Sequence, residues 1–222
     1  MLNAIEEVKL WEKTEATNIL KQCGLSSGMM VLDLGCGDLH YTVPASIVVG
    51  EEGIVFAVDH SKNIIESNTK YLLREGIKNV KMIHSNHQGL KQICENRVDF
   101  LMLYDVIHVI PRFEIFPIIN CLLNDTGIFS FLAFGEIRIQ KDQNGHLIKN
   151  EKGKNVTFPY DQALEKLIDE IQSYGFRLSH VVENSGVHFD HFHSSYHWKK
   201  YGEVRLNTLE RGSIYNFVKS FH

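Results

Sequence analysis

The residues best placed to do chemistry lie in one glycine-containing segment and at an acidic position that follows it. Residues 31–39 read Val-Leu-Asp-Leu-Gly-Cys-Gly-Asp-Leu, and Asp59 ends the next apolar run. Gly35 and Gly37 allow a tight turn and let a ligand approach the main chain closely. An acidic side chain at the end of the next strand can hold ribose hydroxyls, as in mononucleotide-binding α/β units. Together with Asp33, this spacing predicts a binding site rather than a plain strand-to-helix turn.

The pattern of apolar runs indicates how the fold brings these residues together. Short apolar runs alternate with helical segments along most of the 222 residues. This alternation predicts an α/β fold whose parallel sheet is covered on both faces, with the carboxyl ends of the strands at one ligand-binding edge. The predicted strands are residues 30–34, 54–58, 80–83, 98–103, 127–134, 176–182 and 213–219, and the predicted helices are residues 4–23, 42–49, 61–75, 88–95, 113–123 and 162–174.

Several expectations about these elements depend on single residues. Pro44 is acceptable in a helix because it falls in the first turn. Ser61 is a good N-terminal cap for the next helix, and Gly76 is a good terminator. Asp99 begins a strand far from the ligand edge, so we expect it to pair or cap there rather than bind a ligand.

Two segments depart from the alternation. Residues 136–159 carry Asn144-Gly145 between short alternating runs, which is a hairpin signal. Residues 184–211 are rich in His and aromatic side chains. Each leaves from the carboxyl end of a predicted strand, so we expect both to overhang the ligand edge.

Composition narrows the class of protein. The length suits a single domain spanning residues 1–222, and the net charge of −4 argues against a general nucleic-acid binder. No apolar run reaches the roughly 20 residues needed to cross a bilayer. The acidic residues near the N-terminus argue against a secretory signal, and the four cysteines show no Cys-x-x-Cys spacing. We expect a cytoplasmic protein without nucleic-acid or membrane partners, and a homodimer is left open.

At these motifs the chain resembles the class I S-adenosylmethionine-dependent methyltransferases, particularly the small-molecule branch that includes quinone-biosynthesis enzymes. The likeness covers about residues 30–182. It rests on ordered matches to the family's first motif, its ribose-binding motif, its adenine-side position, its strand-four motif and the turn before strand five, found here at residues 31–37, 57–61, 85–86, 98–108 and 122–127.

The resemblance implies a fold, a cofactor and a set of site residues. The fold is a Rossmann-like three-layer sandwich with a mostly parallel seven-stranded sheet and an antiparallel last strand. The activity is methyl transfer from S-adenosyl-L-methionine to a small-molecule acceptor, covered by the N-terminal helix (residues 1–24) and by the two irregular segments. The implied cofactor-binding residues are Asp33, Gly35, Cys36, Gly37, Asp59, His60, Ser85, Asn86 and Tyr104, and the catalytic candidates are His108, Tyr104 and Asp105.

Two positions depart from the family pattern. Leu39 replaces a usual third glycine, which would put a side chain near the cofactor's path, and Ser85 or Asn86 stands where an aspartate often faces adenine. These departures favour an alternative, a non-catalytic S-adenosylmethionine-binding partner or sensor. A dehydrogenase is disfavoured, because the glycine it would need three residues after Gly37 is His40.

The acceptor side leaves several hypotheses open. His108 either accepts a proton from the acceptor or packs beneath the cofactor, and methyl transfer mainly requires in-line positioning. The His- and aromatic-rich run at residues 188–200 either recognises the acceptor or forms an ordinary lid or interface. A metal site there is disfavoured, since strand periodicity would place His188 and Asp190 on one face and His191 and His193 on the other. Thiol chemistry such as arsenite methylation is a minority hypothesis, because the cysteines show no reactive grouping.

Overall fold

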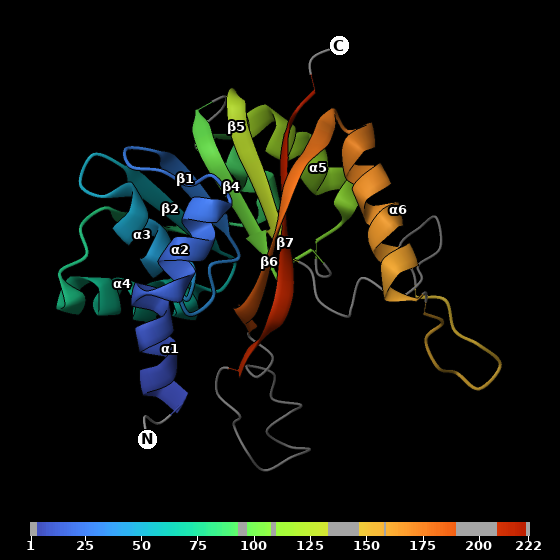
Figure 1. Ribbon diagram of the computed structural model, residues 1–222, viewed down its shortest axis with the longest axis horizontal. Coiled ribbons are helices and arrows are strands. Elements are labelled where there is room, and N and C mark those ends of the chain that lie inside the picture. Colours follow the sequence, from blue (N-terminus) through green and yellow to red (C-terminus); the bar gives the residue numbers. More distant parts are fainter. Residues whose placement is uncertain are drawn as a thin grey trace.

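The computed structural model describes residues 4–92, 97–107, 110–132, 147–157, 159–189 and 208–220, which are organised around one twisted sheet (Figure 1). Its strand order is β3-β2-β1-β4-β5-β7-β6. The first five strands are parallel, and β7 is antiparallel to both β5 and β6. The predicted sheet with an antiparallel last strand is confirmed. The strands are β1 (Met30–Leu34), β2 (Ile54–Asp59), β3 (Val80–His84), β4 (Val98–Tyr104), β5 (Leu123–Leu132), β6 (Phe176–Phe189) and β7 (Thr208–Lys219).

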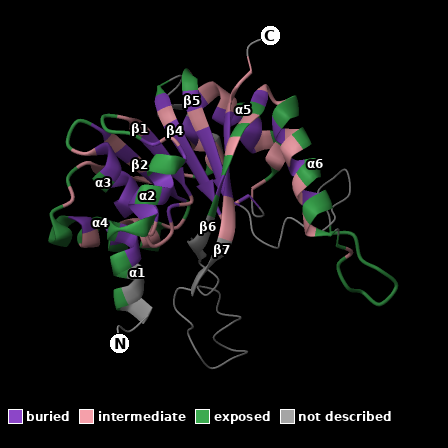
Figure 2. Ribbon diagram, in the orientation of Figure 1, coloured by how far each residue is buried: buried purple, intermediate pink, exposed green. Residues whose placement is uncertain are grey.

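Helices cover both faces of the sheet. One buried cluster joins the sheet to η1, α5 and α6, and two others join its opposite face to α1, α2, α3 and α4. The central strand β4 is buried along nearly its whole length (Figure 2), as expected for a parallel strand covered on both sides. The helices are α1 (Ala4–Lys13), α2 (Glu15–Gln22), α3 (Thr42–Val49), α4 (Lys62–Glu75), η1 (His87–Gln92, a 3-10 helix), α5 (Arg112–Leu122) and α6 (Tyr160–Ser173). None of these helices is long and apolar enough to span a membrane.

Most single-residue expectations hold. Pro44 lies in the first turn of α3, the Ser61 side chain accepts a hydrogen bond from the backbone of Ile64, and Gly76 ends α4 with φ of +70°. Asp99 accepts hydrogen bonds from the backbone N–H of Met30 at 2.7 Å and from the side chain of Asn124. Its predicted pairing at the start of β4 is therefore confirmed.

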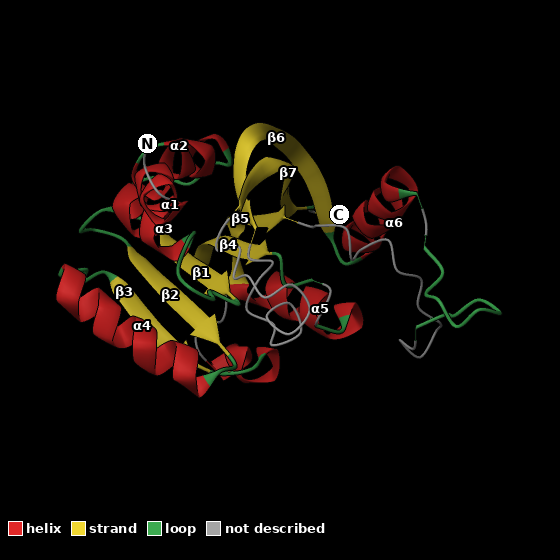
Figure 3. Ribbon diagram, turned by 90° about the horizontal axis from the view of Figure 1, so that it is seen from below, coloured by secondary structure: helices red, strands yellow, loops and turns green. Residues whose placement is uncertain are grey.

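The N-terminal segment is two helices rather than the single helix predicted over residues 4–23. The break falls at Thr14, which has φ of −119° and ψ of −83°. Its hydroxyl donates to the carbonyl of Leu10 at 2.7 Å, and such back-bonding often bends helices. Consequently α2 packs Ile19 and Leu20 on the sheet, while α1 turns toward the carboxyl ends of the strands (Figures 1 and 3).

The last two strands are longer than predicted. Residues that the sequence assigned to an insertion over 184–211 continue as a β-ribbon, which runs from the pair Asn184 and Gly212 to the pair Phe189 and Thr208. An irregularity between residues 184 and 187 lets pairing continue where the sequence indicates a break. Because the last residue of β5 pairs with Ile214, the ribbon extends about six residues, roughly 20 Å, beyond the ligand edge. The predicted overhang is confirmed here, and residues 190–207 lie outside the described part.

The described part of the other irregular segment is a small hairpin. The predicted Asn144-Gly145 turn lies outside the described residues. Within residues 147–157, Lys149 pairs with Asn155, and the Asn150 side chain accepts backbone hydrogen bonds from Lys152 and Lys154 at 3.0 Å each. This hairpin projects beside α6, away from the ends of β1 and β4 (Figure 3), and its predicted role as a cover for the acceptor stays a prediction.

Candidate functional site

The glycine turn after β1 folds over the ends of two neighbouring strands. The backbone N–H groups of Gly35 and Cys36 both donate to the carbonyl of Val58 at the end of β2, at 2.8 and 3.0 Å. Gly35 has φ of +80°, and a Cβ there would lie 2.4 Å from a methyl group of Val106, just after β4. Only glycine fits this position. The turn therefore brings the ends of β1, β2 and β4 to one point.

Asp59 is bound directly to this turn. Its carboxylate is buried and accepts the N–H of Gly37 at 3.3 Å and the N–H of Ser61 at 2.8 Å. An ionised carboxylate has about four acceptor positions, so acceptor capacity remains for ribose hydroxyls. The structure thus brings together the turn and the acid that the sequence paired. His60 is exposed, with its Nδ1 atom 3.4 Å from Asp59.

Asp33 is the most electrostatically perturbed acid of the site. It is buried and accepts a 2.5 Å hydrogen bond from the hydroxyl of Thr42, the first residue of α3. Burial raises the pKa of Asp33 to about 7, the Thr42 hydrogen bond opposes this rise, and the charge of Asp59 adds to it. A carboxylate held at such a pKa is stabilised in its charged form by a bound cation. Sequence reasoning missed Thr42, whose only signal was a hydroxyl at a helix start.

Leu39 lies in the core. Its side chain is 1% exposed and packs with Cys36, Val43, Ala57 and Leu72. The expectation that this side chain stands in the cofactor's path is therefore wrong. Its backbone has φ of +70°, a conformation that costs an L-residue roughly 1–2 kcal/mol. Burial of a leucine side chain is worth about as much, which offsets that strain.

The two predicted adenine-side residues follow β3, next to Asp59. The N–H of Ser85 donates to the carbonyl of Asp59 at 3.1 Å, which fixes this loop beside the end of β2. The side chain of Asn86 accepts the N–H of Gly89 at 3.1 Å and so shapes η1. A contact that sequence reasoning missed, His87 with Glu114 at 2.9 Å, joins η1 to α5.

Tyr104 ends β4 with its hydroxyl inside the protein. It shares a 2.7 Å hydrogen bond with Ser130, which in turn donates to Asn216 at 2.8 Å. Its ring meets Tyr41 edge-on at a centroid distance of 4.6 Å. Burial raises the pKa of Tyr104 well above its ordinary value, so the hydroxyl stays protonated and is a poor base. These contacts fit positioning of the strand end better than proton transfer.

Asp105 follows Tyr104 directly and has a strained backbone conformation. It has φ of +54°, and its N–H donates to the carbonyl of Leu132, the last residue of β5. Strained residues cluster at ligand sites, and aspartate tolerates the left-handed region better than most residues. His108, the remaining catalytic candidate, lies outside the described residues.

The comparison with protein families decides how this site is to be interpreted. A model described as a methyltransferase domain matches residues 25–186, which include the glycine turn, Asp59 and the end of β4. The chain belongs to the methyltransferase family. Its membership confirms the resemblance to class I S-adenosylmethionine-dependent methyltransferases.

Individual methyltransferases resemble this chain at low sequence identity. A demethylmenaquinone methyltransferase from Geobacillus stearothermophilus is 26% identical over 103 residues, which cover 46% of this chain and 42% of the relative. The match thus spans less than half the length of that relative. A methyltransferase structure from Aquifex aeolicus superposes with a TM-score of 0.60 at 20% identity, over 98% of this chain and 100% of the other. Fibrillarin from Aeropyrum pernix, in complex with S-adenosyl-L-methionine, gives 0.52 at 14% identity, over 86% and 67%.

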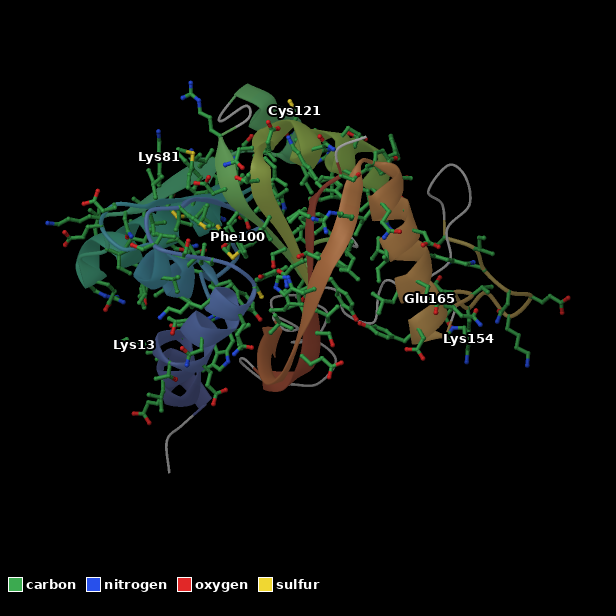
Figure 4. The ribbon with its side chains drawn as sticks, turned by 45° about the horizontal axis from the view of Figure 1, so that its top comes forward. Lys13, Lys81, Phe100, Cys121, Lys154 and Glu165 are labelled. Carbon is green, nitrogen blue, oxygen red and sulfur yellow. The ribbon has the colours of Figure 1, made fainter. Side chains whose placement is uncertain are left out.

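The three cysteines in the described part of this methyltransferase do not gather at one place. Cys23 and Cys36 are buried, and burial raises the pKa of Cys23 to about 11 and that of Cys36 further still. Cys121 lies on α5, on the side of the molecule opposite α1 (Figure 4). Buried thiols with raised pKa are inert, which argues against thiol-based chemistry at Cys23 and Cys36. Among the described residues, no group of three His, Cys, Asp or Glu could hold a metal ion.

Proposed function

We propose that the protein transfers a methyl group from S-adenosyl-L-methionine to a small-molecule acceptor. The observation that carries the proposal is the glycine turn bound to Asp59, with buried Asp33 beside it. The cofactor presents an ammonium group and ribose hydroxyls, which suit two carboxylates at the ends of adjacent strands. The glycine turn, held at the ends of β1 and β2, suits close approach of its methionine portion to the main chain. When bound, the cofactor supplies a methyl group activated on a sulfonium.

The chain's own residues then bind and orient the cofactor and the acceptor. Asp59 accepts from the ribose, Asp33 faces the ammonium group, and Ser85 or Asn86 borders adenine. The acceptor lies at the end of β4, beside Asp105, between α1 and the ribbon formed by β6 and β7. In-line alignment at that point is what methyl transfer mainly requires.

The acceptor class and a cytoplasmic location are the finer parts of the proposal. A small-molecule acceptor is supported by similarity to proteins named demethylmenaquinone methyltransferases. The cytoplasmic location is supported by four scattered cysteines. Because Leu39 lies in the core, one of the two observations that favoured a non-catalytic binding protein is removed, and the other, Ser85 or Asn86 in place of an adenine-side aspartate, remains.

Calorimetry with S-adenosyl-L-methionine and with S-adenosylhomocysteine tests the proposal. We expect one equivalent of each to bind the folded protein, and Asp59→Ala to weaken both. Methyl transfer from labelled cofactor to a panel of quinols and phenols then tests the acceptor class. The proposal is abandoned if the protein gives a cooperative unfolding transition yet binds neither compound.

A further inference from the structure

Helix α1 contacts the segment that leads from the glycine turn into α3. The ring of Trp11 meets Tyr41 edge-on, at a centroid distance of 5.5 Å and an interplanar angle of 87°. Tyr41 in turn meets Tyr104 at the end of β4. Both Trp11 and Tyr41 are buried, so α1 packs against residues at the ligand edge of the sheet.

A second contact beside the first is polar. The Glu12 carboxylate lies 2.7 Å from Nδ1 of His40, and the two side chains are only 9% and 13% exposed. A buried carboxylate is costly unless it is paired, so this contact determines where Glu12 can lie. Glu12 also faces α4, since burial and then the Glu12 charge raise the pKa of Tyr71.

The contacted residues stand between two features that shape the cofactor site. Leu39, with its strained backbone, comes directly before His40, and Thr42, which donates to Asp33, comes directly after Tyr41. A strained backbone conformation persists only where its surroundings hold it. Burial of the Leu39 side chain holds it from one side, and the contacts of α1 hold the following two residues.

We propose that Glu12, acting through His40, is a positioning residue for the cofactor, so that α1 completes the cofactor site as well as flanking the acceptor. The inference rests on the proposed function. The Glu12–His40 pair fixes the chain between Leu39 and Thr42, and thereby fixes both the turn amides and the carboxylate of Asp33. Without the pair, the turn samples conformations in which these groups are misaligned, and cofactor affinity falls.

The test compares two Glu→Gln variants that each weaken one polar contact of a glutamate side chain. Glu12→Gln weakens the pair at the turn, and Glu170→Gln weakens the 2.8 Å pair with Arg112 between α5 and α6. Calorimetry should show S-adenosylhomocysteine binding about tenfold weaker in Glu12→Gln, the size expected for one charge-assisted hydrogen bond, and unchanged in Glu170→Gln. Hydrogen exchange without ligand should accelerate in residues 35–43 of Glu12→Gln alone.

The outcomes separate the inference from the function it rests on. If wild type binds and Glu12→Gln loses thermal stability but no more affinity than Glu170→Gln, the inference is overturned and the proposed function stands. If folded wild type binds no cofactor, the proposed function fails, and the inference with it. If Glu12→Gln does not fold, His40→Gln serves in its place: weaker binding with a preserved melting temperature supports the inference, and unchanged binding overturns it.

Discussion

The cofactor side and the acceptor side of this molecule are built in different ways. On the cofactor side, the turn at residues 35–41 is fixed by backbone hydrogen bonds to β2, by Asp59 and by a tight contact with Val106. On the acceptor side, the end of β4 meets a protruding ribbon and the strained residue Asp105. Apart from Val106, the parts of the first lie within 30 residues of sequence, whereas the second is assembled from segments far apart in the chain. Binding and acceptor choice should therefore respond to different substitutions.

The largest expected effect on cofactor affinity comes from adding a side chain at Gly35. Gly35→Ala combines a positive φ with a 2.4 Å approach to Val106, so it should lower the free energy of unfolding by about 3 kcal/mol. Displacement of the turn amides should also weaken S-adenosylhomocysteine binding by about 100-fold, the equivalent of that energy. Chemical denaturation and calorimetry measure the two.

The matched control for that variant is Gly28→Ala. Gly28 has the same φ of +80° with nothing within 4 Å of its added Cβ, so it isolates the backbone cost, roughly 1–2 kcal/mol. The double variant Gly35→Ala/Val106→Ala should recover part of the loss. If Gly35→Ala and Gly28→Ala weakened S-adenosylhomocysteine binding equally, the turn at Gly35 would have no specific role in binding the cofactor.

The next effect separates two aspartates at opposite ends of the sheet. Asp59→Asn should weaken cofactor binding about 30-fold through loss of charge-assisted hydrogen bonds, with little change in stability. Asp99→Asn should do the reverse, because its partners are Met30 and Asn124 at the start of β4. Calorimetry and thermal unfolding of both variants measure these two effects. A comparable loss of affinity in the two variants would contradict the assignment of Asp59 to cofactor binding.

The cofactor side was also the more predictable one, for a physical reason. Turn, strand and acid lie within 30 residues of sequence, so local patterns locate them, and Ser61 and Gly76 act through their own neighbours. The break at Thr14, the extension of β6 and the burial of Leu39 were not predicted, because each is decided by tertiary contacts. Leu39 shows this most clearly: its type and position indicated obstruction, but a positive φ turns the side chain into the core.

The third prediction is that stability and cofactor affinity both depend on pH through Asp33. Because the folded-state pKa of Asp33 is raised to about 7 from 3.8, the folded protein holds a proton that the unfolded chain has lost between those values. Stability should therefore fall as pH rises from 4 to 7, by up to about 1.4 kcal/mol per pH unit, and stay level above. Cofactor affinity should change in the opposite sense, strengthening up to pH 7 as the carboxylate ionises.

Asp33→Asn should remove both dependences. The variant should be more stable than wild type at pH 8, with a difference that shrinks toward pH 5, and should bind the cofactor weakly at every pH. Thermal unfolding and calorimetry across this range measure them. A wild-type affinity that is flat from pH 5 to 8 would mean that Asp33 does not face the ammonium group.

The smallest effect concerns Tyr104, where the two sides meet. Tyr104→Phe removes the hydroxyl that bonds Ser130 but keeps the ring against Tyr41, so unfolding should become about 1 kcal/mol easier, the usual worth of one hydrogen bond. Cofactor affinity should change by less than about threefold, below the 1.4 kcal/mol that a tenfold change represents. Calorimetry and denaturation distinguish two roles of Tyr104. A tenfold loss of affinity without destabilisation would make Tyr104 a cofactor ligand, whereas destabilisation without loss of affinity would show that it supports the end of β4. The second result would leave Asp105 as the residue through which β4 acts on the acceptor side.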